Sequence, residues 1–213
     1  MIKACIFDLD GVIVDTAHYH FLAWRRLGKE LGVDLTEADN EKLKGVSRMQ
    51  SLQIILDMGK INLAKDRKES LATRKNEWFV EYVEAMKPDE IFPGVKQLIT
   101  AVRKKGIKVA LASSSKNAPR VVELLGIRGL FDVIVDGSMI IDTKPDPEIF
   151  LLTAQKLNLK PKDCVVFEDA EAGVEAAIRA GMKCVGVGSE NLSQANRIVR
   201  KTADFKIEEL NDL

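Results

Sequence analysis

The sequence has few of the residues that mark a secreted, disulfide-bonded or zinc-binding protein. Its 213 residues include only three cysteines and two histidines. Cys5, Cys164 and Cys184 are widely scattered and lie in or beside apolar stretches, which excludes a disulfide framework or a zinc site and predicts buried, reduced thiols. His18 and His20 have no acidic or cysteine partner at metal-ligand spacing.

An excess of charge of either sign is also missing. Lys and Arg together number 32, as do Asp and Glu, so the net charge is zero and nothing points to nucleic acid or an anionic membrane as a partner. No apolar run approaches membrane-spanning length, and the N-terminus leads directly into a predicted strand, so we expect no signal peptide. We therefore expect a cytoplasmic monomer that acts on a small molecule, with enough apolar residues (46%) to build a core.

Three common active-site motifs are absent. No Gly-x-Gly-x-x-Gly follows the first predicted strand, and the sequence contains neither a Walker motif nor a nucleophile elbow. Any catalytic site in this sequence must therefore be built from other residues than these motifs provide.

The sequence does contain a regular alternation of strand and helix patterns outside one long insert. Strands are predicted at 4–7, 107–112, 132–135, 164–167 and 183–187, with helices between the later ones. Strand and helix in repetition predict an α/β fold with a doubly wound parallel sheet. Residues 16–87 show only helical patterns, at 17–32, 36–43, 49–58 and 64–86. The predicted domains are a core of residues 1–15 and 88–213 and an all-α cap of residues 16–87, joined by two linkers that form a hinge.

Polar side chains follow four of the predicted strands. They are Asp8, Ser113, Lys144 and the pair Glu168-Asp169. Because the carboxyl ends of parallel strands share one edge of the sheet, these residues can converge. A nucleophile, cation ligands and donors to phosphoryl oxygens are what phosphoryl transfer requires.

The pattern Asp8-x-Asp10-Gly11-x-x-x-Asp15 resembles motif I of the haloacid dehalogenase superfamily. The resemblance implies that Asp8 attacks phosphorus and becomes an aspartyl phosphate, and that Asp10 acts as general acid and base. It also implies a Rossmann-like core with a helical cap.

The resemblance extends to the other motifs of the superfamily. It implies one Mg²⁺ held by Asp8, the backbone carbonyl of Asp10, Asp169 and, directly or through water, Glu168. Ser113 and Lys144 would donate to the phosphoryl oxygens. Oxygen ligands with some waters are the coordination that Mg²⁺ prefers.

Further similarity lies in the stretches 15–20, 43–48, 74–76, 110–117, 144–145 and 168–173. Through them, the sequence is similar to the β-phosphoglucomutase branch of the superfamily over nearly its whole length. That branch interconverts β-D-glucose 1-phosphate and β-D-glucose 6-phosphate, with glucose 1,6-bisphosphate as the priming intermediate. Ser114 and Ala170 depart mildly from its pattern. The resemblance implies a set of sugar-phosphate-binding residues, namely Trp24, Lys44, Gly45, Val46, Ser47, Arg48, Ser51, Lys75, Ser115, Lys116 and Asn117.

A bisphosphate needs a second anion site away from the nucleophile. Arg48, in a polar turn of the cap, offers a bidentate guanidinium for it, and Ser115, Lys116 and Asn117 precede a predicted helix. His20, near the first linker, is expected to titrate near neutral pH and to hydrogen-bond a carboxylate of the core. Two alternatives remain open: a sugar-phosphate phosphatase with the same core, and a protein that binds a phosphorylated ligand without turning it over.

Overall fold

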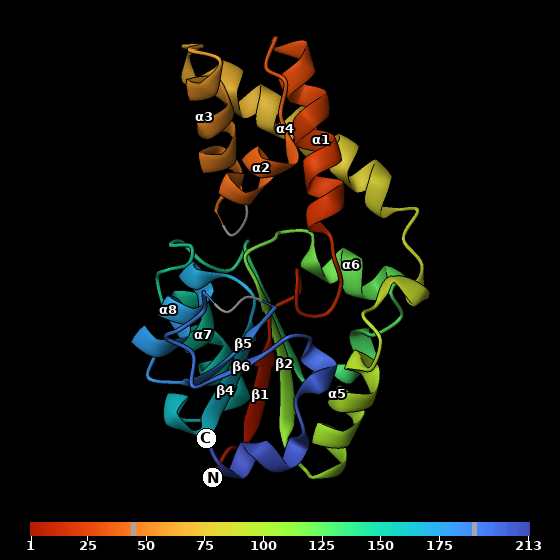
Figure 1. Ribbon diagram of the computed structural model, residues 1–213, viewed down its shortest axis with the longest axis vertical. Helices are drawn as coiled ribbons and strands as arrows, with labels where there is room; N and C mark the ends of the chain where they lie inside the picture. The colour runs from red at the N-terminus through yellow and green to blue at the C-terminus, as the bar shows by residue number, and fades with distance from the viewer. Residues whose placement is uncertain (44–45, 189–190) are drawn as a thin grey trace. The chain divides into compact units, whose positions relative to one another are not determined.

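The chain divides into two compact units. The computed structural model describes residues 1–43, 46–188 and 191–213. Met1–Asp15 and Lys87–Leu213 form one unit, the core unit, and Thr16–Met86 form the other, the helical unit. Figure 1 shows that the sheet belongs to the core unit and that helices make up the other.

A six-stranded parallel sheet in the order β3-β2-β1-β4-β5-β6 forms the centre of the core unit. The chain order and the parallel pairing confirm the doubly wound α/β fold. β1 is buried on both faces, which explains why its sequence is a continuous apolar run without alternation. The strands are β1 (Ala4–Phe7), β2 (Lys108–Ser113), β3 (Val133–Asp136), β4 (Cys164–Glu168), β5 (Lys183–Val187) and β6 (Arg197–Val199).

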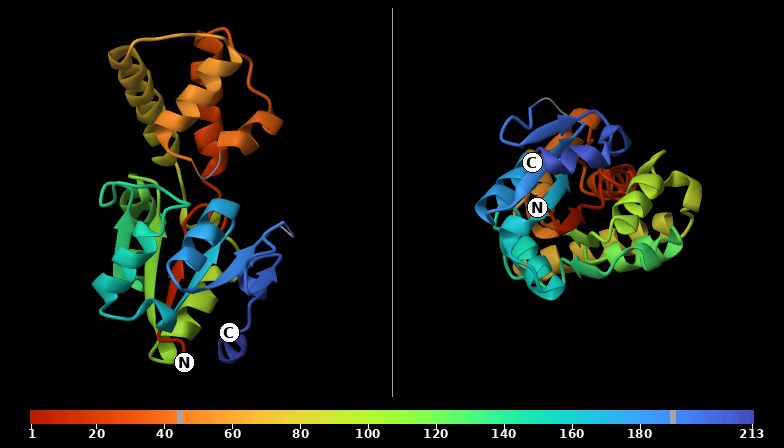
Figure 2. Two further views of the ribbon diagram at one scale, coloured as in Figure 1. Left: turned by 90° about the vertical axis from the view of Figure 1, so that its left-hand side faces the viewer. Right: turned by 90° about the horizontal axis from the view of Figure 1, so that it is seen from below.

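Helices cover both faces of this sheet, with α5 and α6 on one face and α7 and α8 on the other (Figures 1 and 2). The apolar side of each helix packs on the sheet, and the connections that lead from β1 through β5 each contain at least one helix. The helices are α5 (Val95–Lys104), α6 (Ala118–Leu124), α7 (Glu148–Leu157) and α8 (Glu171–Arg179). Short 3₁₀ turns are η2 (Pro88–Glu90), η3 (Arg128–Leu130), η4 (Pro161–Asp163), η5 (Thr202–Asp204) and η6 (Ile207–Asn211).

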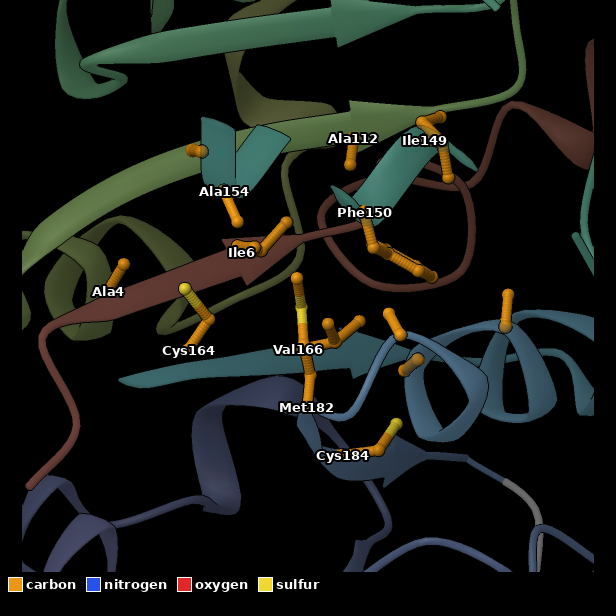
Figure 3. Packing of buried hydrophobic residues seen from close by; sticks show 14 of the residues in the cluster. Ala4, Ile6, Ala112, Ile149, Phe150, Ala154, Cys164, Val166, Met182 and Cys184 are labelled. Atoms are coloured by element: carbon orange, nitrogen blue, oxygen red, sulfur yellow. The ribbon is translucent and has the colours of Figure 1, made fainter. Parts of the chain in front are cut away.

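The two faces of the sheet have different cores. On the side of α7 and α8, Phe150 packs in one cluster with Ile6 and Val166, as Figure 3 shows. On the other side, the rings of Phe7 and Phe167 stack with centroids 4.5 Å apart, and Phe205 meets Phe167 edge-on at 5.1 Å. β1 and β4 are therefore held from both sides up to the points where their polar residues begin.

The helical unit consists of α1 (Ala17–Glu30), α2 (Glu37–Asn40), the 3₁₀ turn η1 (Glu41–Leu43), α3 (Arg48–Met58) and α4 (Lys65–Val83). α1 packs along α4 through buried residues that include Trp24 and Phe79. At the start of α3, the Ser47 hydroxyl accepts a hydrogen bond from the Gln50 amide, and the Gln50 side chain accepts one from the Ser47 amide. This capping box fixes where α3 begins.

The elements differ from their predicted positions mainly in two places. β6 was not predicted, because three residues at a sheet edge carry too little hydrophobic pattern to stand out. The segment 36–43 is a four-residue α2 followed by η1 rather than one helix, and residues 44 and 45 lie outside the described part. Within the described ranges, no helix combines the length and the apolar character needed to cross a membrane.

Candidate active site

Asp8 lies directly after β1, at the edge of the sheet where the parallel strands end. Its amide donates to the Phe167 carbonyl at 3.0 Å, which extends the pairing of β1 with β4 by one residue. Its buried carboxylate accepts a hydrogen bond from the Lys144 ammonium, with Nζ 2.6 Å from Oδ1. The same ammonium lies 2.8 Å from Glu168 Oε2, so one lysine bridges the ends of two central strands.

Lys144 reaches this position from the loop between β3 and α7. Its Nζ lies 5.1 Å from the centroid of the Phe150 ring, and only 7% of the residue is exposed. Burial by itself lowers the pKa of the ammonium, but the carboxylates of Asp8 and Glu168 outweigh it and hold that pKa above its usual range. Lys144 is therefore a charged donor at the Asp8 carboxylate.

Carboxylate oxygens of Asp8, Glu168 and Asp169 lie within 4.8 Å of one another. Two glycines make room for them. A Cβ on Gly11, whose φ is +72°, would lie 1.9 Å from Asp169 Oδ2, and a Cβ on Gly173 would lie 2.0 Å from Glu168 Cδ. Side chains at either position would collide with the carboxylates, so the glycines are needed for the cluster to form.

One lysine does not balance this cluster. Burial, together with the charge of Asp8, raises the pKa of Asp10 to about 8 and that of Asp169 to about 7. Burial raises the pKa of Glu168 to about 8, although Lys144 opposes the shift. In addition, Asp10 Oδ1 is buried and finds no hydrogen-bond partner among the described residues. Crowded carboxylates with an unused oxygen fit a hard divalent cation such as Mg²⁺.

The other predicted core residues lie at the same edge of the sheet. Ser113 is the last residue of β2, and its hydroxyl accepts from the Ser115 amide at 3.2 Å. The Ser115 hydroxyl in turn accepts from the Asn117 amide at 3.2 Å. These turns place Ser115, Lys116 and Asn117 just before α6, with Lys116 exposed.

In the helical unit, the predicted residues His20, Trp24 and Lys75 lie together. Lys75 is 1% exposed, with its Nζ 2.6 Å from His20 Nδ1 and 4.4 Å from the centroid of the Trp24 ring. The His20 ring stacks on Phe79 at a centroid distance of 3.8 Å. The expectation that His20 titrates near neutral pH is wrong, because burial and the charges of Lys75 and Arg48 lower its pKa well below the usual value.

Arg48 is the first residue of α3 and is partly buried. Its guanidinium donates to Asn76 Oδ1 at 2.7 Å, and burial lowers its pKa. Ser51, by contrast, is buried, and its hydroxyl donates to the backbone carbonyls of Leu43 and Ser47. Of the remaining predicted residues in this turn, Val46 is exposed, Ser47 caps α3, and Lys44 and Gly45 lie outside the described residues.

Three residues that contact the predicted site residues were not themselves predicted to be functional. Asn76 bonds Arg48, Phe79 stacks on His20, and Phe150 underlies Lys144. Asn76 and Phe79 had usable signals, since Asn76 belongs to the stretch 74–76 that carries the family resemblance and Phe79 follows Lys75 by four residues on the same helix face.

Comparisons with known proteins identify the family to which the chain belongs. The family model of the haloacid dehalogenase-like hydrolases matches residues 2–181. A β-phosphoglucomutase from Bacillus subtilis is 42% identical over 213 residues, which cover 99% of this chain and 94% of that one. A phosphorylated carbohydrates phosphatase from Thermotoga maritima is 38% identical over 85% of this chain and 82% of its own. The crystal structure of a β-phosphoglucomutase from Clostridium difficile superposes with a TM-score of 0.95 at 44% identity, covering 100% of this chain and 96% of that chain. The chain therefore belongs to the haloacid dehalogenase-like hydrolase family.

Proposed function

We propose that this protein is a phosphoryl-transfer isomerase that interconverts β-D-glucose 1-phosphate and β-D-glucose 6-phosphate. The observation that carries the proposal is the buried Asp8 carboxylate, hydrogen-bonded by Lys144 and surrounded by Asp10, Glu168 and Asp169. The near full-length similarity to β-phosphoglucomutases supports isomerisation as the overall reaction.

In the first half-reaction, Asp8 attacks a phosphorus atom of glucose 1,6-bisphosphate. The bond from phosphorus to the sugar oxygen breaks, an aspartyl phosphate forms, and Asp10 gives a proton to the leaving oxygen. In the second, the other hydroxyl of a sugar monophosphate loses its proton to Asp10 and takes the phosphoryl group from Asp8. In the protein without metal, burial and the charge of Asp8 raise the pKa of Asp10 to about 8, which supports a role for this carboxyl group as a proton donor.

Lys144 and Ser113 are the proposed donors to the transferring phosphoryl oxygens. Asp8, the Asp10 carbonyl, Asp169 and Glu168 are the proposed holders of Mg²⁺. When bound, Mg²⁺ supplies positive charge next to the phosphoryl oxygens. The buried acidic cluster supports this assignment.

The helical unit is the proposed holder of the second phosphate, through Arg48. Asn76 orients the guanidinium, and the buried Lys75, which lies over the Trp24 ring, holds His20 as a further polar group of this unit. Because hydrolysis of the aspartyl phosphate competes with transfer, a mutase must also exclude water. We also propose that the protein is a cytoplasmic monomer, and its three free, buried cysteines fit a reducing compartment.

A sugar-phosphate phosphatase is the second candidate, because the Thermotoga maritima relative carries that name. The two are separated by assaying β-glucose 1-phosphate with and without glucose 1,6-bisphosphate, while glucose 6-phosphate and inorganic phosphate are both measured. A mutase lags or stalls without the bisphosphate and releases little phosphate. Steady phosphate release that matches substrate loss, with no isomer formed, would replace the mutase assignment by the phosphatase.

A further inference from the structure

A residue close to the C-terminus bonds directly to the loop that carries Asp10. The hydroxyl of Thr202, in η5, donates to the Val12 carbonyl at 2.6 Å across 190 positions of sequence. Thr202 is 1% exposed and the Val12 side chain is fully buried, so this hydrogen bond is shielded from water. Residue 202 also lies beyond residue 181, where the match to the family model ends.

The loop concerned is a closed turn. The Gly11 amide donates to the Val14 carbonyl at 2.9 Å, and the Ile13 amide donates to the Leu9 carbonyl at 2.9 Å. Asp10 sits inside this turn, two residues from the carbonyl that Thr202 holds. Any displacement of that carbonyl is therefore passed to Asp10 through two peptide units that are themselves tied into the turn.

Two separate segments anchor the turn. The Phe92 amide donates to the Ile13 carbonyl at 2.9 Å, and Thr202 holds the adjacent carbonyl of Val12. Without Thr202, the Val12 carbonyl would be left buried without its side-chain donor, a state that folded proteins avoid by shifting the backbone. Thr202 thus adds a buried hydrogen bond, from a second segment, to a turn that Ile91 and Phe92 contact at Ile13 and Val14.

The segment that carries Thr202 is itself fixed. Phe205 packs edge-on against Phe167 of β4, with centroids 5.1 Å apart. Ala203 lies so close to Gly94 that a Cβ on the glycine would come within 2.5 Å of the alanine Cβ. These contacts hold the backbone around Thr202 in place, and a residue that positions another group must itself be held in this way.

We propose that Thr202 is a positioning residue for proton transfer by Asp10. It touches no reacting atom, and it acts by holding the Val12 carbonyl and with it the turn from Leu9 to Val14. This inference rests on the proposed role of Asp10 in phosphoryl transfer.

The chain contains a matched control for the ordinary structural value of such a hydrogen bond. Thr153, in α7, is also fully buried, and its hydroxyl donates to the Ile149 carbonyl at 2.7 Å. Thr202→Val and Thr153→Val each remove one buried hydroxyl from one backbone carbonyl without changing side-chain volume greatly. Only the first touches the turn that carries Asp10.

The test separates the step that needs Asp10 from the step that does not. Acetate leaves from acetyl phosphate without requiring a proton, so rapid-quench acetate release reports phosphorylation of Asp8. Transfer from the phosphoenzyme to glucose 6-phosphate requires a base, and so does its hydrolysis by water. In Thr202→Val we expect transfer to slow by at least about tenfold while acetate release stays within about twofold, since a small displacement of a catalytic group is costly. Thr153→Val should leave both rates unchanged, and Thr202→Ser should restore transfer.

Transfer rates in Thr202→Val that match those of Thr153→Val would overturn the proposal, as would failure of Thr202→Ser to restore them. Should Thr202→Val not fold, Thr202→Ala against Thr153→Ala gives the same comparison with a smaller side chain. If the wild-type protein forms no isomer, the proposed mutase function fails, and hydrolysis of the phosphoenzyme by water still tests Thr202.

Discussion

The ammonium group of Lys75 lies 2.6 Å from Nδ1 of His20. An ammonium can only donate, so Nδ1 accepts and the proton of the neutral imidazole resides on Nε2. The buried lysine therefore fixes the tautomer of the histidine and, after burial itself, is the main cause of its lowered pKa. Nε2–H is left as the donor that His20 offers to its surroundings.

Replacing Lys75 by Met should raise the pKa of His20 toward its ordinary value, because a neighbouring positive charge is lost while burial remains. NMR titration of the imidazole measures this shift. Lys68→Met is the control, since Lys68 lies on the same helix and bonds Gln53 instead. An unchanged His20 titration in Lys75→Met would show that Lys75 does not contribute to the lowered pKa of His20.

The lowered pKa of His20 also makes the free energy of unfolding depend on pH. His20 does not reduce that free energy above about pH 6.5, where it is neutral in both states, but reduces it as the pH falls from there toward the folded-state pKa.

Arg48→Ala should reduce isomerisation by roughly 30-fold or more. Loss of a charge-assisted pair with phosphate in a closed site costs about 2–5 kcal/mol, by analogy with truncated buried pairs, and each 1.4 kcal/mol or so is tenfold. Hydrolysis of acetyl phosphate should change by less than about twofold, because that substrate has no second phosphate. Arg74→Ala, which removes an arginine that pairs with Glu30 on the same unit, is the control. Equal losses in both assays would assign Arg48 to the stability of the helical unit instead.

Asp8→Asn should abolish turnover, because an amide cannot attack phosphorus. The protein should stay folded, because the amide oxygen still accepts a hydrogen bond from Lys144 and Lys144 keeps its ion pair with Glu168. Activity, circular dichroism and mass mapping of the phosphoenzyme check this. Asp163→Asn, at the opposite end of the strands and paired with Lys3, should keep full activity. A phosphoryl group found on another residue of the wild-type protein would remove Asp8 from this role.

Mg²⁺ should raise the melting temperature more at pH 8 than at pH 6. In the metal-free protein the folded-state pKa values of Asp10, Glu168 and Asp169 are raised to about 7–8, so its stability falls as the pH rises from about 4 to 8. Mg²⁺ binds the ionised carboxylates of Glu168 and Asp169 and competes with their protons, so its contribution grows over the same range. Thermal melts with and without Mg²⁺ measure the increase in melting temperature at each pH. The effects of His20 and of other groups that do not bind Mg²⁺ are the same in both melts and so cancel in this difference.

In Asp169→Ala this increment should largely disappear, and activity should require much more Mg²⁺. Full activity of the wild-type protein in excess chelator would contradict a role for the metal. An equal increment at both pH values would show that these carboxylates are already ionised at pH 6.

The sequence predicted the core unit well because its signals are local. An apolar run followed by Asp8 marks a buried strand and its end, and the chain turns just beyond it at Gly11, whose φ is +72°. The parallel sheet then follows from the alternation of strands and helices. The short edge strand β6 had no comparable signal.

Contacts between distant residues could not be predicted in the same way. Lysine is rarely buried, so nothing in the sequence placed Lys75 against a histidine 55 positions away, and the pKa of His20 was misjudged for that reason. For Lys144, the sequence predicted the correct edge of the sheet but not its bridge between Asp8 and Glu168. The hydrogen bond from Thr202 to Val12 links two segments with no shared pattern at all.

The position of β1 at the centre of the sheet has a consequence for synthesis on the ribosome. Ala4 pairs with Lys108 on one side and with Cys164 on the other, so the first strand to emerge has no partner until more than half the chain has been made. Every residue of the helical unit, Thr16–Met86, precedes Lys108 in the chain, so this unit can be complete before either partner of β1 has been made. Helices form quickly, whereas strands that are distant in sequence pair late. The helical unit should therefore fold before the core unit into which it is inserted. During that time the apolar β1 is unpaired, so chaperones or rapid elongation are needed to keep it from aggregating.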